Sequence, residues 1–396
     1  MDFISERIKN LAPSATLAMS QKSSELKAKG VDVINLSVGE PDFDTPDFIK
    51  EGAIRAIRDN YSFYTPVAGY LSLRQAIAER IKKDDGIELS DDNIVVSNGA
   101  KQALSNVIMS TVNPGDEVII PTPAWVSYFE MVKLAQGVPV TVGTSMSSGF
   151  KISPEQLEEA ISPKTRMIVL CTPSNPTGAV YSAEELQLLV DVLKRHPGVL
   201  VLADEIYRHI IYTGGFRSLG SFQEIADRTV VVNGVSKAYA MTGWRIGYMS
   251  GPKEIAKACT KLQGQTTSNP CSIAQKAAET ALTGPQHQVA SMCEAFRHRR
   301  DLILSLVNDI PGWHTLKPDG AFYIFPDVSG CLGKRFGNRI IKSGQDLVMY
   351  LLEEAHVATV DGEAFGTPGF IRLSYATSED KIREALNRIK NALISH

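Results

Sequence analysis

A lysine stands in the stretch of this sequence with the strongest chemical character. Lys237 lies within residues 234–247, directly after the apolar run 229–233, whose β-branched residues are typical of a buried strand. It should therefore lie just beyond the carboxyl end of a strand, where open α/β sheets bind their ligands. A free lysine has a pKa near about 10.4, so it is a nucleophile at neutral pH only when burial or nearby positive charge lowers that pKa.

Two neighbours of this lysine indicate what it holds. Ser236 precedes it and Arg245 follows it by eight positions, a pattern that suits the phosphate of a cofactor joined to the lysine through its amine. Pyridoxal 5′-phosphate is such a cofactor, because enzymes carry it as a Schiff base with lysine. Most Ser-Lys pairs are ordinary surface residues, so this interpretation depends on the other motifs.

Two loops provide further candidate binding groups. Gly99, Ala100 and Lys101 stand between an expected strand and an expected helix, so their backbone amides and the helix N-terminus can bind an anion. Asn175 lies in a loop fixed by two prolines and a glycine, which directs its amide to the edge of the sheet. A plain structural turn is the alternative for the second loop.

Two charged side chains belong to apolar strands. Asp204 ends such a strand, where an isolated charge is costly, and a protonated pyridine nitrogen would be a suitable partner. Tyr207 could reach the phenolic oxygen of the same ring. Arg372 lies inside another apolar strand and needs an anion, for which a carboxylate is the best geometric match. The structural alternatives are a capping role for Asp204 and an internal ion pair for Arg372.

Alternating strands and helices are expected to position these groups. The runs typical of strands are residues 94–97, 118–120, 138–142, 167–171, 199–203 and 230–233. Such alternation predicts a mainly parallel sheet covered by helices on both faces. Beyond Pro311 the pattern changes to strands among helices, which predicts a second, smaller α+β domain. We expect an arm over 1–13, a small domain formed by 14–46 and 286–396 that includes a long linking helix, and a large domain over 47–285.

The composition excludes several classes of protein. The 396 residues are 43% hydrophobic and 21% charged, as in a globular protein with more than one core. A net charge of −3 without a basic block gives no footprint for nucleic acid, and no apolar run is long enough to span a membrane. The five cysteines are widely spaced, and the first residues carry acids where a signal peptide would be basic. The sequence therefore predicts a cytoplasmic protein without a disulfide framework or a metal site.

Together the motifs resemble those of the class I pyridoxal-phosphate-dependent aminotransferases. Residues 234–247 are similar to the cofactor-attachment pattern of that family, and the other motifs follow in the family's order. Residues 37–46 and 240–245 resemble the bacterial-type aspartate aminotransferases of subgroup Ib. The resemblance runs from about Pro13 to the C-terminus. It implies the type I pyridoxal-phosphate transferase fold, an α/β fold with a mostly parallel seven-stranded sheet in the large domain, and a homodimer with shared active sites.

The resemblance also implies a role for each candidate residue. Lys237 forms the Schiff base and moves a proton between the substrate Cα and the cofactor. Asp204 holds the pyridinium nitrogen, Tyr207 and Asn175 hold the phenolic oxygen, and Trp125 stacks on the ring. The phosphate is bound by Arg245, Ser236, the backbone of Gly99, Ala100 and Lys101, and Tyr64 from the neighbouring subunit. The substrate is bound by Arg372 and the Gly39 backbone at its α-carboxylate, by Lys101, Ser14 and Thr16 at its side-chain carboxylate, and by Trp125 and Asn175.

Three points qualify this assignment. Gly234 stands where some relatives have a phosphate-binding serine, and Trp125 has the alternative of a packing aromatic. Ala12 stands where relatives that accept prephenate tend to carry a basic residue, which favours aspartate and 2-oxoglutarate, with aromatic amino acids as secondary substrates. A lyase on the same scaffold would keep the cofactor residues, and a non-enzymatic regulator would carry an added DNA-binding domain.

Overall fold

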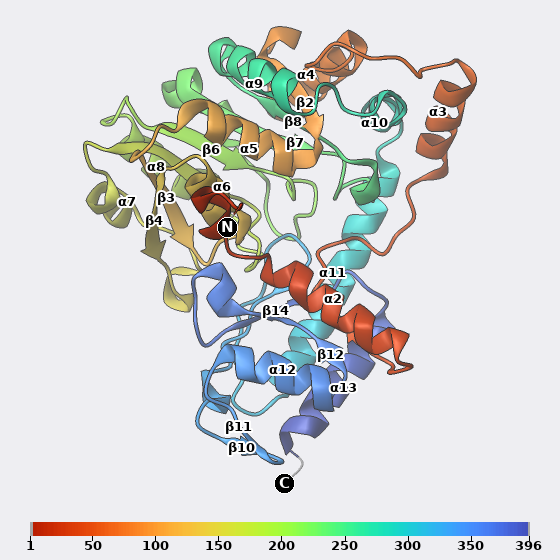
Figure 1. The fold of residues 1–396 in the computed structure, drawn as a ribbon, viewed down its shortest axis with the longest axis vertical. Coiled ribbons are helices and arrows are strands. Elements are labelled where there is room, and N and C mark those ends of the chain that lie inside the picture. Colours follow the sequence, from red (N-terminus) through yellow and green to blue (C-terminus); the bar gives the residue numbers. More distant parts are fainter. Residues whose placement is uncertain (1–2, 395–396) are drawn as a thin grey trace.

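A seven-stranded sheet forms the centre of the larger of two lobes in the computed structural model, which describes residues 3–394 (Figure 1). In spatial order the strands are β2 (Ile94–Asn98), β8 (Ile246–Ser250), β7 (Thr229–Gly234), β6 (Leu200–Asp204), β5 (Thr165–Cys171), β3 (Glu117–Thr122) and β4 (Val138–Gly143). Only β8 runs antiparallel to its neighbours in this sheet. The mostly parallel sheet of seven strands expected from the sequence is therefore present.

The apolar runs predict six of these strands and miss β8. Gly247 is the second residue of β8, and a Cβ built on it would lie 2.1 Å from the backbone nitrogen of Ala100. A side chain is therefore excluded at the point where the start of the next helix closes on the strand. A glycine inside a strand weakens its apolar pattern, which explains why this strand was not recognised.

Helices cover both faces of the sheet. One face packs against α5 (Gly99–Thr111), α6 (Ser127–Leu134) and α9 (Lys253–Thr266). The other packs against α3 (Asp47–Arg58), α4 (Leu71–Asp85), α7 (Pro154–Ala160), α8 (Ala183–Leu193) and α10 (Ser272–Thr283). Within β5, Met167 and Val169 belong to the first core and Ile168 and Leu170 to the second. This alternation is the period of two that a strand buried on both faces requires.

Segments from both ends of the chain form the smaller lobe. Its strands are β1 (Ile34–Asn35), which pairs with β12 (Val357–Ala358), the three-stranded set β13 (Val360–Asp361), β14 (Ile371–Ser374) and β9 (Tyr323–Ile324), and the hairpin of β10 (Arg335–Phe336) and β11 (Arg339–Ile340). Its helices are α2 (Ala15–Ala28), α12 (Gly344–Glu354) and α13 (Glu379–Ile394). One hydrophobic core joins side chains of residues 19–36 to those of residues 296–393. The single strand expected over 357–360 is divided between two sheets.

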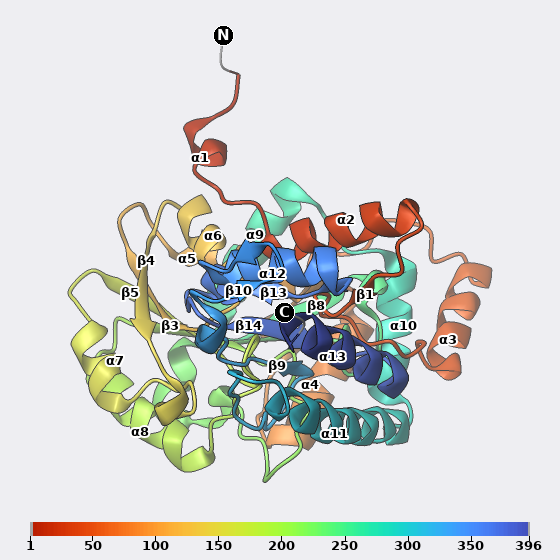
Figure 2. The same ribbon diagram turned by 90° about the horizontal axis from the view of Figure 1, so that it is seen from below.

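A long helix connects the lobes. The helix α11 (His287–Asn308) passes from the larger lobe to the smaller one in Figure 1. At the other end of the sequence, α1 (Glu6–Lys9) extends away from the body of the molecule, as Figure 2 shows. The domain boundaries given above stay predictions. No helix within residues 3–394 combines the length and the apolar character needed to cross a bilayer.

Candidate active site

The candidate residues meet at one cavity of about 300 Å³ beside the carboxyl ends of the parallel strands. Those that line it are Ser14, Thr16, Gly39, Ala100, Lys101, Trp125, Asn175, Asp204, Tyr207, Ser236, Lys237, Arg245 and Arg372. Two candidates are not part of the lining. Gly99 lies behind the Arg245 guanidinium, and Tyr64 is on the surface, 93% exposed. One chain alone thus brings together every candidate except the one assigned to the neighbouring subunit and one backbone position.

Lys237 follows the end of β7 and reaches into this cavity. Its Nζ donates a hydrogen bond to the carbonyl oxygen of Gly39 at 2.6 Å. Burial lowers the pKa of the lysine to about 8; the nearby Glu40 carboxylate acts in the opposite direction, and the Arg245 and Arg372 guanidinium groups add to the lowering. About one in ten of these amines is then neutral at pH 7, far more than for a free lysine. The site therefore activates the amine by desolvation and positive charge.

Asp204 is the last residue of β6 and lies at the bottom of the cavity. The Tyr128 hydroxyl donates to its Oδ2 at 2.6 Å, and the backbone nitrogen of Ile206 donates to its Oδ1 at 3.2 Å. Burial raises the pKa of this carboxyl group. The Lys237 charge lowers that pKa to a lesser extent. No lysine or arginine of the described chain forms an ion pair with Asp204, so a protonated ring nitrogen could pair with it directly.

Tyr128 was not among the sequence candidates. It lies on α6, three positions after Trp125, and the two rings meet edge to face with centroids 5.4 Å apart. Its side chain is buried, so the hydroxyl has to find a partner there. The helical spacing from Trp125 is the signal that would have placed both side chains on one face.

The beginning of α5 forms a cradle for an anion. Gly99 has a φ of 81°, and a Cβ on it would lie 2.3 Å from Nη2 of Arg245. Arg245 donates to the carbonyl oxygens of Thr242 at 2.9 Å and Asn98 at 3.2 Å, and no carboxylate in residues 3–394 forms an ion pair with it. A guanidinium without a counter-ion beside the N-terminus of a long helix is suited to a phosphate.

The glycine that departs from the family pattern has a packing reason. A Cβ on Gly234 would lie 2.8 Å from the Cα of Gly247 and 2.8 Å from the carbonyl oxygen of Ile246. A serine at this position would force β7 and β8 apart. Ser236 is buried and lines the cavity, so it is the nearest hydroxyl that could replace the missing one.

Arg372 is a buried cation that forms no ion pair within residues 3–394. It belongs to β14 and is 1% exposed. Its Nη1 donates to Oδ1 of Asn175 at 2.8 Å, its Nη2 donates to the carbonyl oxygen of Ser37 at 2.5 Å, and its buried Nε has no hydrogen-bond acceptor in the part of the chain that the structure describes. Burial lowers the pKa of this guanidinium. The buried positive charge of Arg372 and its unused Nε–H donor favour an anionic partner. A carboxylate fits the geometry of the guanidinium group.

Tyr323 of β9 is a second residue that the sequence did not reveal. Its hydroxyl lies 2.7 Å from that of Tyr207, and its ring centroid lies 4.5 Å from the Arg372 guanidinium. A Cβ on Gly39 would come within 2.0 Å of the same hydroxyl. Gly39 is therefore a glycine because this tyrosine occupies the space of a side chain.

Three further polar side chains line the same cavity. Lys101 Nζ lies 4.9 Å from the centroid of the Trp125 ring, and burial, followed by the nearby Arg245 charge, lowers the pKa of Lys101. Thr16 Oγ1 is buried without a hydrogen-bond partner, and Ser14 caps α2 through a long contact of 3.5 Å to the backbone nitrogen of Leu17. A second anionic group would satisfy all three.

Known proteins resemble this chain over nearly its whole length. The family model of class I and II aminotransferases matches residues 31–389. An aspartate/prephenate aminotransferase of Nitrosomonas europaea is 49% identical over 98% of this chain and 99% of its own. The crystal structure of the aspartate aminotransferase from Rhizobium meliloti has a TM-score of 0.96 at 45% identity, with 99% of both chains covered. The aspartate aminotransferase from Thermus thermophilus with maleate has a TM-score of 0.93 at 42% identity, covering 99% of this chain and 100% of that one.

These similarities confirm the fold class and the family that the motifs predicted. The matched region includes the lysine, the arginines and the aspartate that the cavity brings together. The chain belongs to the class I and II aminotransferases.

Proposed function

We propose that the protein transfers the amino group of L-aspartate to 2-oxoglutarate and uses pyridoxal 5′-phosphate as its cofactor. The observation that carries this proposal is the buried Arg372, which has no counter-ion among the described residues and an unused Nε, in the same cavity as Lys237. Lys101 adds a second cation without an ion pair in the described chain. Two such anchors suit a substrate with two carboxylates.

The residues present fit the cofactor in three places. Asp204 is a buried carboxylate without a cationic partner in residues 3–394, which suits a protonated ring nitrogen. The cradle of Gly99 and Arg245, with Ser236, suits the phosphate. Lys237 would hold the cofactor through its amine. When bound, the cofactor supplies an electron sink for negative charge at the substrate Cα.

The other side chains would orient the substrate and move the proton. Arg372 would fix the α-carboxylate, so that the Cα proton faces the Lys237 amine. This amine would remove the proton from Cα and carry it toward the cofactor. Tyr207 and Asn175 would fix the ring through its phenolic oxygen, and Trp125 would cover one ring face. We expect Tyr128 to keep the Asp204 carboxylate in place through the 2.6 Å hydrogen bond.

Prephenate is a second candidate substrate. Several relatives that are 46–49% identical to this chain are named aspartate/prephenate aminotransferases or probable ones. Ala12 argues against prephenate, because relatives that accept it tend to carry a basic side chain at this position. Purified protein tested with pairs of amino and oxo acids should transfer from aspartate to 2-oxoglutarate with the highest efficiency and leave prephenate unused. Equal transfer to prephenate would show that Ala12 is not decisive, and no transfer between any pair would contradict the proposed function.

The specificity for a dicarboxylic substrate should depend on Lys101. A charge-assisted hydrogen bond in a desolvated site contributes about 1.5–3 kcal/mol, so Lys101→Ala should lower kcat/KM for aspartate by roughly 10- to 100-fold and that for phenylalanine far less. Steady-state kinetics with both substrates measure this difference. Lys133→Ala, on an exposed lysine of α6, is the matched control and should change neither value. An equal loss for both substrates would assign Lys101 to the cofactor.

We also propose a homodimer in the cytoplasm with active sites completed across the interface. Large apolar or aromatic side chains are exposed on one chain, namely Leu17, Ile57, Phe63, Tyr64 and Leu71. Tyr64 is the least covered of these and contributes nothing to the cavity of its own chain. A second copy of the chain would cover such groups and bring Tyr64 to the neighbouring phosphate position.

Mixing two inactive variants should restore activity if the sites are shared. In a heterodimer of Tyr64→Ala and Lys237→Ala chains, one of the two sites has both native residues, so we expect about half of the native activity per dimer. Differently tagged chains allow the heterodimer to be isolated before the assay. A heterodimer as inactive as its parents would show that Tyr64 serves the site of its own chain and not that of the neighbour.

A further inference from the structure

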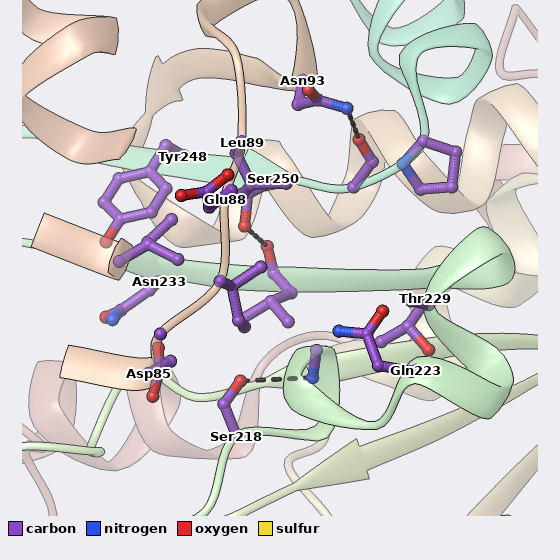
Figure 3. A pocket seen from close by; sticks show the side chains of 18 of the residues that line it. Asp85, Glu88, Leu89, Asn93, Ser218, Gln223, Thr229, Asn233, Tyr248 and Ser250 are labelled. Carbon is purple, nitrogen blue, oxygen red and sulfur yellow. Dashed lines mark hydrogen bonds between the residues drawn. The ribbon is translucent and has the colours of Figure 1, made fainter. Parts of the chain in front are cut away.

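A second cavity, of about 380 Å³, lies in the larger lobe and shares no lining residue with the first (Figure 3). It opens over β7 and β8, between the end of α4 with residues 86–93 on one side and the 3₁₀ turns Leu219–Ser221 and Gln223–Arg228 on the other. These two sides belong to different hydrophobic cores on the same face of the sheet. The cavity is therefore the part of this face that no helix covers.

The floor of this cavity is polar although it is buried. It consists of alternate residues of the two strands, and four of the five are polar and at least 95% buried: Thr229, Asn233, Tyr248 and Ser250, with Val231 between them. The residues that alternate with them, Val230, Val232 and Met249, belong to the apolar core on the other face. Polar side chains on a buried sheet face are costly without partners. Thr229 and Ser250 meet this need by donating to the carbonyl oxygens of Ile225 at 2.8 Å and Val231 at 3.5 Å.

The other two floor residues, Asn233 and Tyr248, have polar groups without a hydrogen-bond partner among the described residues. The Tyr248 hydroxyl, on a residue 4% exposed, has no hydrogen-bond partner in the described chain. Asn233 is 5% exposed, its Oδ1 accepts from the Gly234 nitrogen at 2.7 Å, and its amide NH₂ has no hydrogen-bond partner among the described residues. The two residues pair directly across β7 and β8, and Figure 3 shows their polar ends on the same side of the strands. They form one ready contact point for a bound molecule.

The charges of the cavity exclude an anion. Arg208 is the basic residue among the described lining residues, and its guanidinium is bound to Asp85 at 2.8 and 2.5 Å and to Glu205 at 3.3 Å. The other charged lining residues, Glu88 and Asp227, are carboxylates with side chains 78% and 77% exposed. An anion would find no free positive charge, because the two carboxylates bound to Arg208 leave no net positive charge there.

One wall of the cavity is apolar, and the cavity is narrow beside it. Ile81, Ile87 and Leu89 line one side. A Cβ on Gly220, across the cavity, would lie 3.4 Å from Cδ1 of Ile87, so the two sides approach closely there. A volume of this size is within the range of small-molecule sites, which combine apolar walls with a few polar groups.

We propose that this cavity binds a molecule without negative charge, of the size of a nucleoside or a monosaccharide, which forms hydrogen bonds with the Asn233 amide and the Tyr248 hydroxyl. This inference is independent of the proposed transamination. The unused polar groups determine the hydrogen bonds, and the pairing of Arg208 with two carboxylates excludes a negatively charged molecule.

The test measures binding to the cofactor-loaded protein without amino-acid substrates. Titration calorimetry with adenosine, uridine and D-glucose should reveal at least one probe that binds once per chain with a Kd in the low millimolar range or below. Tyr248→Phe and Asn233→Asp should each weaken this probe about tenfold or more, because each removes one hydrogen-bonding group and keeps the shape. Adenosine monophosphate should bind at least about tenfold more weakly than adenosine if adenosine is the probe that binds.

Matched variants keep this test decisive. Tyr239→Phe is the control, because its hydroxyl bonds Gln286 and does not line the cavity, and it should leave binding unchanged. Ser250→Leu fills the floor with apolar volume and should abolish binding even if another variant folds poorly; thermal melting monitors the fold. Absence of saturable binding for all three probes would overturn the proposal. So would equal binding to the native, Tyr248→Phe and Ser250→Leu proteins, or adenosine monophosphate binding as tightly as adenosine.

Discussion

Replacing Lys237 by alanine is expected to lower kcat for transfer from aspartate to 2-oxoglutarate by at least about 10³-fold, because a positioned proton-transfer group alone contributes 10²- to 10⁴-fold. The lysine is the buried amine of the cavity whose pKa, at about 8, allows it to act near neutral pH. Alanine removes both the covalent anchor and the base, whereas Asp204 and Arg245 keep their positions. Kinetic assays of the purified variant, with cofactor content measured separately, give the comparison.

Two further variants isolate the role of this amine. Lys237→Arg keeps a positive charge without a usable nucleophile and should be as inactive as the alanine variant. Lys276→Ala is the matched control, since this partly buried lysine forms an ion pair with Glu279 away from the cavity, and its activity should be close to native. An alanine variant at position 237 that keeps more than about a tenth of the native rate contradicts the assignment, because another group would then have to act as the base.

Local patterns were sufficient to find the residues that end strands. Asp204 and Lys237 follow apolar runs, and parallel strands bring their carboxyl ends to one edge, so their proximity follows from the fold class. The same reasoning does not reach residues whose role arises from packing. Tyr128 is significant only because its hydroxyl meets Asp204, 76 positions away in the sequence. Tyr323 is significant only because the smaller lobe places it against Gly39 and Tyr207.

The strand β8 shows the same limit for the fold. Its pattern is interrupted by Gly247, which is required by contact with the start of α5 and not by the strand itself. The second cavity depends on this strand too, because Asn233 and Tyr248 become neighbours only through the antiparallel register of β7 and β8. A sequence pattern contains neither the register nor the unused hydrogen-bonding groups that follow from it.

Replacing Arg372 by lysine should lower kcat/KM for aspartate and for phenylalanine by a similar factor of roughly 10²–10³, because every amino-acid substrate has the α-carboxylate that this residue is proposed to bind. Lysine keeps the charge but not the planar fork. The hydrogen bonds to Asn175 and Ser37 that hold the guanidinium would be lost or replaced by poorer ones, and charged hydrogen bonds contribute about 1.5–3 kcal/mol each.

The pattern of loss distinguishes this residue from Lys101. Arg300→Lys is the matched control: Arg300 is 2% exposed, and its guanidinium bonds Asp301 and the carbonyl oxygen of Pro318 outside the cavity, so the variant tests the general cost of a buried arginine-to-lysine change. Thermal melting of both variants separates this cost from substrate binding. A loss confined to aspartate would assign Arg372 to the side-chain carboxylate. The substrate would then lie in the reverse orientation, with its α-carboxylate at Lys101, and the unused Nε of Arg372 would serve specificity and not the group common to all substrates.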